Sequence, residues 1–152
     1  MNEQSNYQVD QFLNKLFKLR WLSKKHLAEE LTAYQITPAQ YAALKNLLDE
    51  PNGMKMSVLA KRANQVSATM TGIIDRLEGQ QLVQRTRLES DRRNVYVHIT
   101  DKGKNLLEEI MDSKKAKFQQ ILDHFDEHQK ALLFETIDSA IEYFNENLRG
   151  NT

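Results

Sequence analysis

Four arginines and two acidic residues lie in a short window in the middle of the chain: Arg85, Arg87, Glu89, Asp91, Arg92 and Arg93. Guanidinium groups gathered in this way suit insertion into a narrow minor groove of DNA, where the negative potential is greatest. Asp91 could hold a neighbouring arginine in position through a charge-assisted hydrogen bond. The same residues also fit a charged edge hairpin whose role is to block aggregation. The window therefore predicts either DNA binding or protection of a strand edge.

The basic residues are concentrated, although 21 Lys and Arg balance 21 Asp and Glu over the 152 residues. Residues 55–104 hold ten basic and five acidic side chains, whereas residues 105–152 hold five basic and ten acidic ones. A basic centre beside an acidic flank favours a polyanion-binding module on a scaffold that the polyanion does not attract. A solvated basic surface is the alternative interpretation.

Other chemistry finds little support in the residue types. The chain has no cysteine, which excludes disulfides, thiol nucleophiles, thiol redox switches and Cys-ligated metals. His124 and His128 are four residues apart, but a predicted helix start at Asp126 separates them, so a metal site there is not expected. We find no phosphate-binding glycine loop and no Ser/His/Asp order. We therefore expect no enzyme activity, catalytic residue, metal or cofactor.

Two further absences bear on location. The chain begins without a basic segment followed by an apolar run, so no signal peptide is expected. Since no stretch approaches 18 uncharged apolar residues, no membrane span is expected either. A cytoplasmic protein is the prediction.

Helical periodicity dominates the elements that must position the arginine window. Apolar residues from Val9 to Leu31 predict a first helix of some 25 residues, which needs a larger partner surface than a small chain offers and so indicates a homodimer. The stretch Thr37-Pro38-Ala39-Gln40 is typical of a capping box and predicts the start of a second helix. A third helix is expected over residues 57–64.

A fourth helix is expected from Ser67, as its cap, to about Gly79. An apolar stripe at helical spacing should face the core: Met70, Ile73, Ile74 and Leu77. The opposite face carries small residues, including Ala68 and Gly72. Glycine is about 1 kcal/mol worse than alanine in a helix, so a slim face needs a reason. Entry into a major groove roughly 12 Å wide supplies one, although a tolerated glycine is the simpler explanation.

The hydrophobic period then changes from helical to alternating. Residues 82–85 and 95–99 predict two strands around the arginine window, which together form a β-hairpin. A long fifth helix capped by Thr100 should run to about Leu122, and a last helix should begin after a capping box at Asp126. The predicted fold is mostly α with a small β-hairpin, in the order of a winged helix-turn-helix with N- and C-terminal dimerisation helices.

Several motifs occur in one order and spacing: Leu59-Ala60-Lys61-Arg62, Asp75-Arg76-Leu77-Glu78, Leu82-Val83-Gln84-Arg85, Asp91-Arg92-Arg93 and Ile99-Thr100-Asp101-Lys102-Gly103. In this combination the chain resembles the MarR family of bacterial transcription regulators over nearly its whole length. The resemblance implies a winged-helix homodimer that binds palindromic double-stranded DNA operators. It divides the chain into a DNA-binding lobe at 37–104 and a dimerisation region at 1–36 and 105–152.

The resemblance also implies roles for particular residues. Ser67, Ala68, Thr69 and Thr71 would face bases or nearby phosphates. Arg93 would enter the minor groove with Asp91 as its orienter, and Arg85 would open the wing. Arg87 and Arg92 complete the set of candidate DNA contacts, and Arg76 would form either a structural salt bridge or a phosphate contact.

The chain also departs from the family pattern. Gln81 stands where a turn glycine is usual, and Gly79 could replace it by a shifted turn. Val66 aligns with the usual serine cap, so the fourth helix could start one residue later, at Ser67. Gly72 stands where many members carry arginine.

The family also suggests an effector pocket between the dimer helices and the DNA-binding lobe. Its candidate lining residues are Trp21, Tyr34, Met54, Met56 and Met111, each of which also fits core packing. The resulting hypothesis is a homodimeric repressor released by a small aromatic ligand. A winged helix that binds an acidic protein partner, without specific DNA binding, is the alternative.

Overall fold

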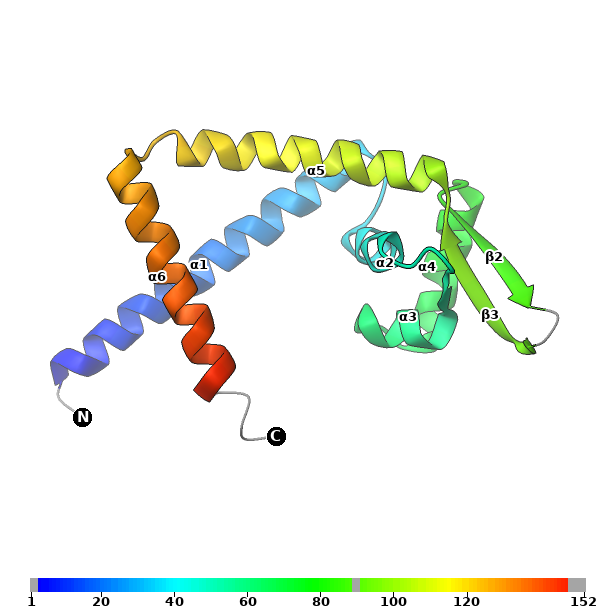
Figure 1. Cartoon of the computed structure of the whole chain (residues 1–152), viewed down its shortest axis with the longest axis horizontal. Helices are drawn as coiled ribbons and strands as arrows, with labels where there is room; N and C mark the ends of the chain where they lie inside the picture. Colours follow the sequence, from blue (N-terminus) through cyan, green and yellow to red (C-terminus); the bar gives the residue numbers. More distant parts are fainter. Residues whose placement is uncertain (1–2, 89–90, 148–152) are drawn as a thin grey trace. The chain divides into compact units, whose positions relative to one another are not determined.

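The computed structural model describes residues 3–88 and 91–147, and of these Glu3, Ser5, Leu88 and Asp91–Arg93 are described by their backbone alone. Within those ranges the chain forms six helices and three strands (Figure 1). They are α1 (Glu3–Ala33), α2 (Pro38–Leu48), β1 (Met54–Lys55), α3 (Met56–Arg62), α4 (Ser67–Gly79), β2 (Val83–Leu88), β3 (Asp91–Ile99), α5 (Asp101–Leu122) and α6 (Glu127–Asn147). The predicted fold class, mostly helical with a small hairpin, is confirmed.

Packing divides the chain into two units, Met1–Ile110 and Met111–Thr152. The first unit contains α1 to β3 and the start of α5, and the second contains the rest of α5 and α6. Among the helices that the structure describes, none combines the length and apolar character needed to span a bilayer.

The first unit is a winged helix built on an antiparallel sheet. Strand order is β1-β3-β2, with Met54 opposite Val97 and Val83 opposite Ile99. Figure 1 shows β2 and β3 as the long ribbon of the wing, beside α3 and α4. The sequence predicts the ribbon but misses β1, because a two-residue strand is too short to show alternation.

The core of this unit gathers one face of each helix against the sheet. The predicted stripe on α4 is buried as expected, with Met70, Ile74 and Leu77 fully buried and Ile73 9% exposed. Side chains from α1, α2, α3, β2, β3 and α5 complete the cluster, among them Leu31, Leu44, Leu59, Val83, Val97 and Leu107. The apolar stripe therefore fixes which face of α4 is turned outward.

Capping side chains begin three of the helices where the sequence predicts. The Oγ1 of Thr37 accepts the N–H of Gln40 at 3.2 Å, and the Gln40 side chain accepts the Thr37 N–H at 2.8 Å. A reciprocal pair of the same kind begins α6 at Asp126. Thr100 accepts the N–H of Gly103 at 3.1 Å at the start of α5. These local signals were sufficient because each bond joins residues three apart.

The start of α4 corrects the prediction that Ser67 is its cap. Ser67 is the first helical residue, and the cap position is taken by Val66 in extended conformation, which makes no side-chain hydrogen bond. An isopropyl group accepts no hydrogen bond, so the first N–H groups of α4 receive no side-chain cap.

The turn into the wing corrects a second expectation. Gly79 stays within α4, and Gln81 itself adopts the left-handed conformation at φ +62°. The N–H of Leu82 reaches the carbonyl of Leu77 and that of Gln81 reaches Glu78, both at 2.9 Å, which forms a Schellman motif. Burial of Leu77 and Leu82 holds this turn in place without a glycine.

Replacing Gln81 by glycine should stabilise the protein. A left-handed conformation costs a residue with a Cβ about 1–2 kcal/mol, and glycine avoids this cost. The greater freedom of glycine in the unfolded chain offsets only part of that gain in stability. We expect the free energy of unfolding in urea to rise by about 0.5–1 kcal/mol. Gln84→Gly, at an exposed position in β2, is the matched control and should lower it. Equal losses for both variants would contradict the strain argument.

Candidate nucleic-acid interface

The outward face of α4 carries the residues that were predicted to contact DNA. Ser67, Ala68, Thr69 and Thr71 are all exposed on the side away from the core. A Cβ added at Gly72 would meet no atom within 4 Å, so no packing contact inside the described chain requires glycine there. This face is slim and polar, as a helix that enters a major groove requires.

The first turn of α4 adds an electrostatic feature to this face. Helix N-termini carry partial positive charge, and the uncapped N–H groups that follow Val66 lie beside Ser67 and Ala68. The Thr71 hydroxyl donates to the carbonyl of Ser67 at 3.1 Å, which fixes its rotamer, and the side chain remains exposed. This end of the helix is suited to phosphate or base contact.

The wing contributes arginines on β2 and at the start of β3. Arg87 is exposed on β2. Asp91, Arg92 and Arg93 lie on β3, but their side chains are outside the described residues, so the roles expected for them stay predictions.

A groove joins the two candidate surfaces. It has a volume of about 460 Å³ and runs between the start of α3, the start of α4 and the sheet. Its lining residues are Met56, Ser57, Ser67, Thr71, Arg85, Arg87, Asn94 and Val95. Four of these belong to the predicted DNA-binding set, whereas Ser57 and Asn94 were missed because they come from separate elements that only the fold brings together. Hydroxyl, amide and guanidinium groups in one groove suit contact with a phosphate backbone.

Arg85 differs from Arg76 and Arg87, the other predicted DNA-binding arginines with described side chains, because it pairs with acidic groups of the protein itself. Its guanidinium contacts Asp75 at 2.6 Å and Glu78 at 2.9 Å, and only 23% of its side chain is exposed. Its own backbone N–H also donates to Glu78, at 3.1 Å. By contrast Arg76 is exposed and forms no ion pair among the described residues. Its predicted phosphate contact stays a prediction.

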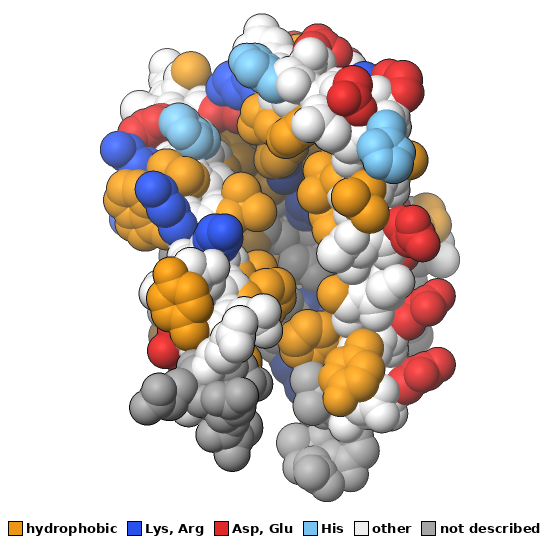
Figure 2. Space-filling model, turned by 90° about the vertical axis from the view of Figure 1, so that its left-hand side faces the viewer, with side chains coloured by type: hydrophobic (Ala, Val, Ile, Leu, Met, Phe, Trp, Pro, Cys, Tyr) orange, Lys and Arg blue, Asp and Glu red, His pale blue; other side chains and the backbone are white. Residues whose placement is uncertain are grey.

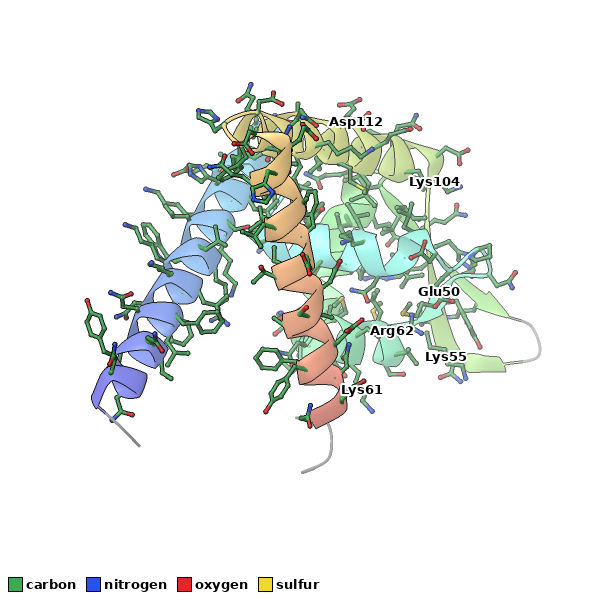
Figure 3. The ribbon with its side chains drawn as sticks, turned by 60° about the vertical axis from the view of Figure 1, so that its left-hand side comes forward. Glu50, Lys55, Lys61, Arg62, Lys104 and Asp112 are labelled. Atoms are coloured by element: carbon green, nitrogen blue, oxygen red, sulfur yellow. The ribbon has the colours of Figure 1, made fainter. Side chains whose placement is uncertain are left out.

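Further basic side chains lie on β1 and α3. Figure 3 shows Arg62 of α3 directed towards Glu50, which it contacts at 2.7 Å. Lys55 lies over the ring of Tyr96, 5.7 Å from its centroid, and Lys61 is exposed on α3. The sequence placed these residues in the basic segment, and Lys61 and Arg62 also in a motif of the family resemblance, without predicting a DNA contact for them.

The five candidate pocket residues do not line one cavity. Tyr34 lines a separate cavity of about 620 Å³, whose other walls are Gln35, Gln80, Leu82, Lys102, Asn105, Leu106 and Glu109. Met54 is 4% exposed and packs in the core, and Met56 lines the groove beside α4. Trp21 is 59% exposed on α1 beneath Lys25, and Met111 belongs to the second unit. Core packing, the alternative considered for each residue, is the observed role of Met54.

The described side chains do not assemble a cluster of metal ligands. Over residues 3–88 and 91–147, no group of three or more His, Asp or Glu side chains could hold a metal ion.

Two helices joined by a tight link, an exposed polar recognition helix and an arginine-bearing ribbon define a winged-helix DNA-binding protein. A sequence profile of the MarR family matches residues 36–95. The transcriptional repressor MdtR of Bacillus subtilis is 30% identical over 103 residues, which are 68% of this chain and 66% of that protein. The repressor YetL of the same organism is 26% identical over 125 residues, 80% of this chain and 75% of its own.

Solved structures agree with this assignment. A MarR family protein from Bacillus stearothermophilus superposes with a TM-score of 0.77 at 25% identity, covering 96% of this chain and 99% of its own. The fold also matches that of S. aureus MepR F27L bound to an oligodeoxyribonucleotide, with a TM-score of 0.69 at 19% identity over 87% and 97% of the two chains. The chain belongs to the MarR family, and it is a DNA-binding transcriptional regulator of the helix-turn-helix type.

Proposed function

We propose that this regulator is a homodimeric repressor that binds a palindromic operator and is released by a small-molecule effector. The observation that carries the proposal is the slim polar face of α4, which shares a groove with the arginine-bearing wing. A helix in the major groove and a ribbon in the adjacent minor groove read neighbouring parts of one site. Two such lobes related by a twofold axis would read an inverted repeat.

Homodimerisation is supported by the large apolar surface that each unit leaves exposed. On α1, large side chains are about half exposed: Phe12, Leu16, Phe17 and Leu19. On α6, which has no buried residue among those described, the same holds for Leu133, Ile137, Ile141 and Phe144. Hydrophobic side chains at the surface are visible in Figure 2. Soluble monomers rarely expose so much contiguous apolar surface, so a second copy of the chain is the proposed cover.

Effector release is supported by the 620 Å³ cavity beside Tyr34. Its volume suits a small ligand, and its lining combines Tyr34, Leu82 and Leu106 with amide and charged groups. The buried Oε1 of Gln80 has no hydrogen-bond partner, so a ligand with a donor group could use it. A ligand that favours a different spacing of the two lobes would weaken operator binding by population shift. Because the chain has no cysteine, a small aromatic ligand fits this switch better than thiol oxidation.

Arg93→Ala should weaken operator binding by more than about 1 kcal/mol, the effect of one lost groove contact. Titration of a labelled operator at fixed salt measures the change. Lys115→Ala is the control, because Lys115 lies outside the predicted DNA-binding lobe at 37–104 and pairs with Asp112 on its own helix. It should leave the affinity within about twofold. Equal affinities for Arg93→Ala and wild type would show that Arg93 does not contact the operator.

Selection of bound sequences from a random DNA pool tests the proposal as a whole. We expect an inverted repeat, because a symmetric dimer presents the same recognition helix twice. Weak binding that is independent of sequence would instead support a winged helix that binds an acidic protein partner. Loss of the enriched repeat in the presence of a ligand that fills the cavity would identify the effector class.

A further inference from the structure

We propose that Arg85 is a positioning residue that sets the angle of the wing against the recognition helix, and that specific operator binding depends on it through Asp75 and Glu78. The inference rests on the proposed operator binding and goes beyond it by separating a residue that aims the wing from those that contact DNA. It also replaces the expectation that Arg85 itself binds DNA.

Arg85 and its three acceptors on α4, namely Thr71, Asp75 and Glu78, form a polar cluster along one side of the helix, called the clamp below. Arg85 is the third residue of β2, and its guanidinium reaches three positions on the helix. It donates to the carbonyl of Thr71 at 3.3 Å, to Asp75 at 2.6 Å and to Glu78 at 2.9 Å. Residues at i, i+4 and i+7 lie on one side of a helix, so a single side chain spans about two turns of α4. A planar guanidinium with fixed donor directions holds an orientation that a lysine ammonium would not.

Glu78 strengthens the clamp because it holds Arg85 twice. One carboxylate oxygen accepts the backbone N–H of Arg85 at 3.1 Å, and the other accepts its guanidinium at 2.9 Å. Both the strand and its side chain are therefore fixed to the C-terminal half of α4. Among the residues that the structure describes, no hydrogen bond joins β2 to α4 beyond Arg85 towards the tip. Arg85 therefore makes the hydrogen bonds between β2 and α4 that lie nearest the tip of the wing.

The local charge argues against a direct phosphate contact by Arg85. One guanidinium faces two carboxylates, so the cluster carries a net negative charge and would repel a phosphate. Only 23% of the Arg85 side chain is exposed, whereas Asp75 is 57% exposed. An arginine that bound DNA through its charge alone would not be paired with two carboxylates of the same lobe.

This arrangement predicts the sign of the effect of Asp75→Asn. Removing an acidic group from a DNA-facing surface ordinarily raises affinity, because repulsion of the phosphates falls. If Asp75 instead holds Arg85 and the wing, the same change should lower affinity for the operator, by about threefold to tenfold. Asp49→Asn is the matched control: Asp49 is exposed in the same unit and forms no ion pair among the described residues. It should leave affinity unchanged or raise it slightly.

The experiment compares wild type, Asp75→Asn, Arg85→Gln and the double variant on the selected operator and on an unrelated duplex, as full chains over a range of salt. We expect Arg85→Gln to lower operator affinity at least tenfold while affinity for the unrelated duplex changes less than threefold. The double variant should be no weaker than Arg85→Gln, since both changes release the same clamp. Footprints should lose the flanking minor-groove protection and keep the major-groove protection.

A different pattern would overturn the inference. If Arg85 contacts phosphate directly, Arg85→Gln should weaken both duplexes equally and reduce the salt slope by about one, and Asp75→Asn should strengthen binding. Unchanged operator binding in both variants would overturn it as well. Should Arg85→Gln fail to fold, the exposed Asp75→Asn still decides the question by its sign. A wild-type chain without preference for any operator would refute the proposed function instead, so the two failures are distinct.

Discussion

Ile137→Glu is expected to convert the regulator into a monomer and to reduce operator affinity at least about 100-fold. Ile137 is 46% exposed on α6, a helix with no buried residue among those described, and it lies on the same stripe as Ile141 and Phe144. A carboxylate in the centre of an apolar dimer interface would be desolvated without a partner. Loss of the dimer removes the second half-site contact, and linked binding contributes a factor of about 10² to 10⁴.

Sedimentation or light scattering, together with operator titration, measures both consequences. Ala131→Glu is the matched control because Ala131 is exposed on the polar side of α6, in line with the acidic Glu135 and Asp138. It should remain dimeric and bind normally. A dimeric Ile137→Glu variant with full affinity would show that α6 does not form the interface, and a monomeric wild type would contradict the dimer itself.

Gly103→Ala is expected to lower the free energy of unfolding by about 2 kcal/mol, in the range found for overpacked sites. An added Cβ at Gly103 would collide with the backbone carbonyl of Leu82 and lie 2.8 Å from a side-chain carbon of Ile99. That carbonyl also accepts the N–H of Thr100 at 3.0 Å, and Thr100 caps α5, so the backbone has little room to move. Close approach of α5 to the turn after α4 therefore requires glycine here.

Thermal or urea unfolding measures this loss. Gly79→Ala provides the contrast within the same unit, because a Cβ at Gly79 would meet no atom within 4 Å. It should leave stability unchanged or raise it by up to about 1 kcal/mol through higher helix propensity. If Gly103→Ala were as stable as wild type, the packing of α5 against the wing turn would be looser than the structure shows.

Structural features that depend on residues close to one another in sequence were predicted correctly. The capping boxes at Thr37 and Asp126, the cap at Thr100 and the buried stripe of α4 were all found at their expected positions. Each depends on hydrogen bonds or spacing within a few residues, and residues so close in sequence are also close in space.

Features that depend on backbone conformation or on distant partners were not predicted. Gln81 takes the left-handed turn because Leu77 and Leu82 anchor it, and nothing local marks it as a substitute for glycine. The partners of Arg85 lie seven and ten residues away on another element, so its sequence position opening the wing indicated only a DNA contact. Charge and motif identify a residue's class, and the fold determines which of its possible partners it meets.

The candidate pocket shows the same limit. Residue type and family resemblance predict a pocket of aromatic and methionine side chains, yet Met54 packs in the core and Met56 lines the groove beside α4. The cavity beside Tyr34 is lined largely by glutamine, asparagine, lysine and glutamate from turns and α5, and nothing in their sequence spacing indicates a shared pocket. Polar walls assembled from three elements can be found only in the folded chain.

A hydroxyl-radical footprint of the wild-type protein on its selected operator tests the central claim most directly. Two copies of α4, held by one dimer, should protect two segments related by twofold symmetry, with centres about 10 base pairs apart on one side of the duplex. Flanking minor-groove protection should mark the two wings. A single unsymmetrical protected segment, or none in dilute salt without an effector, would contradict it.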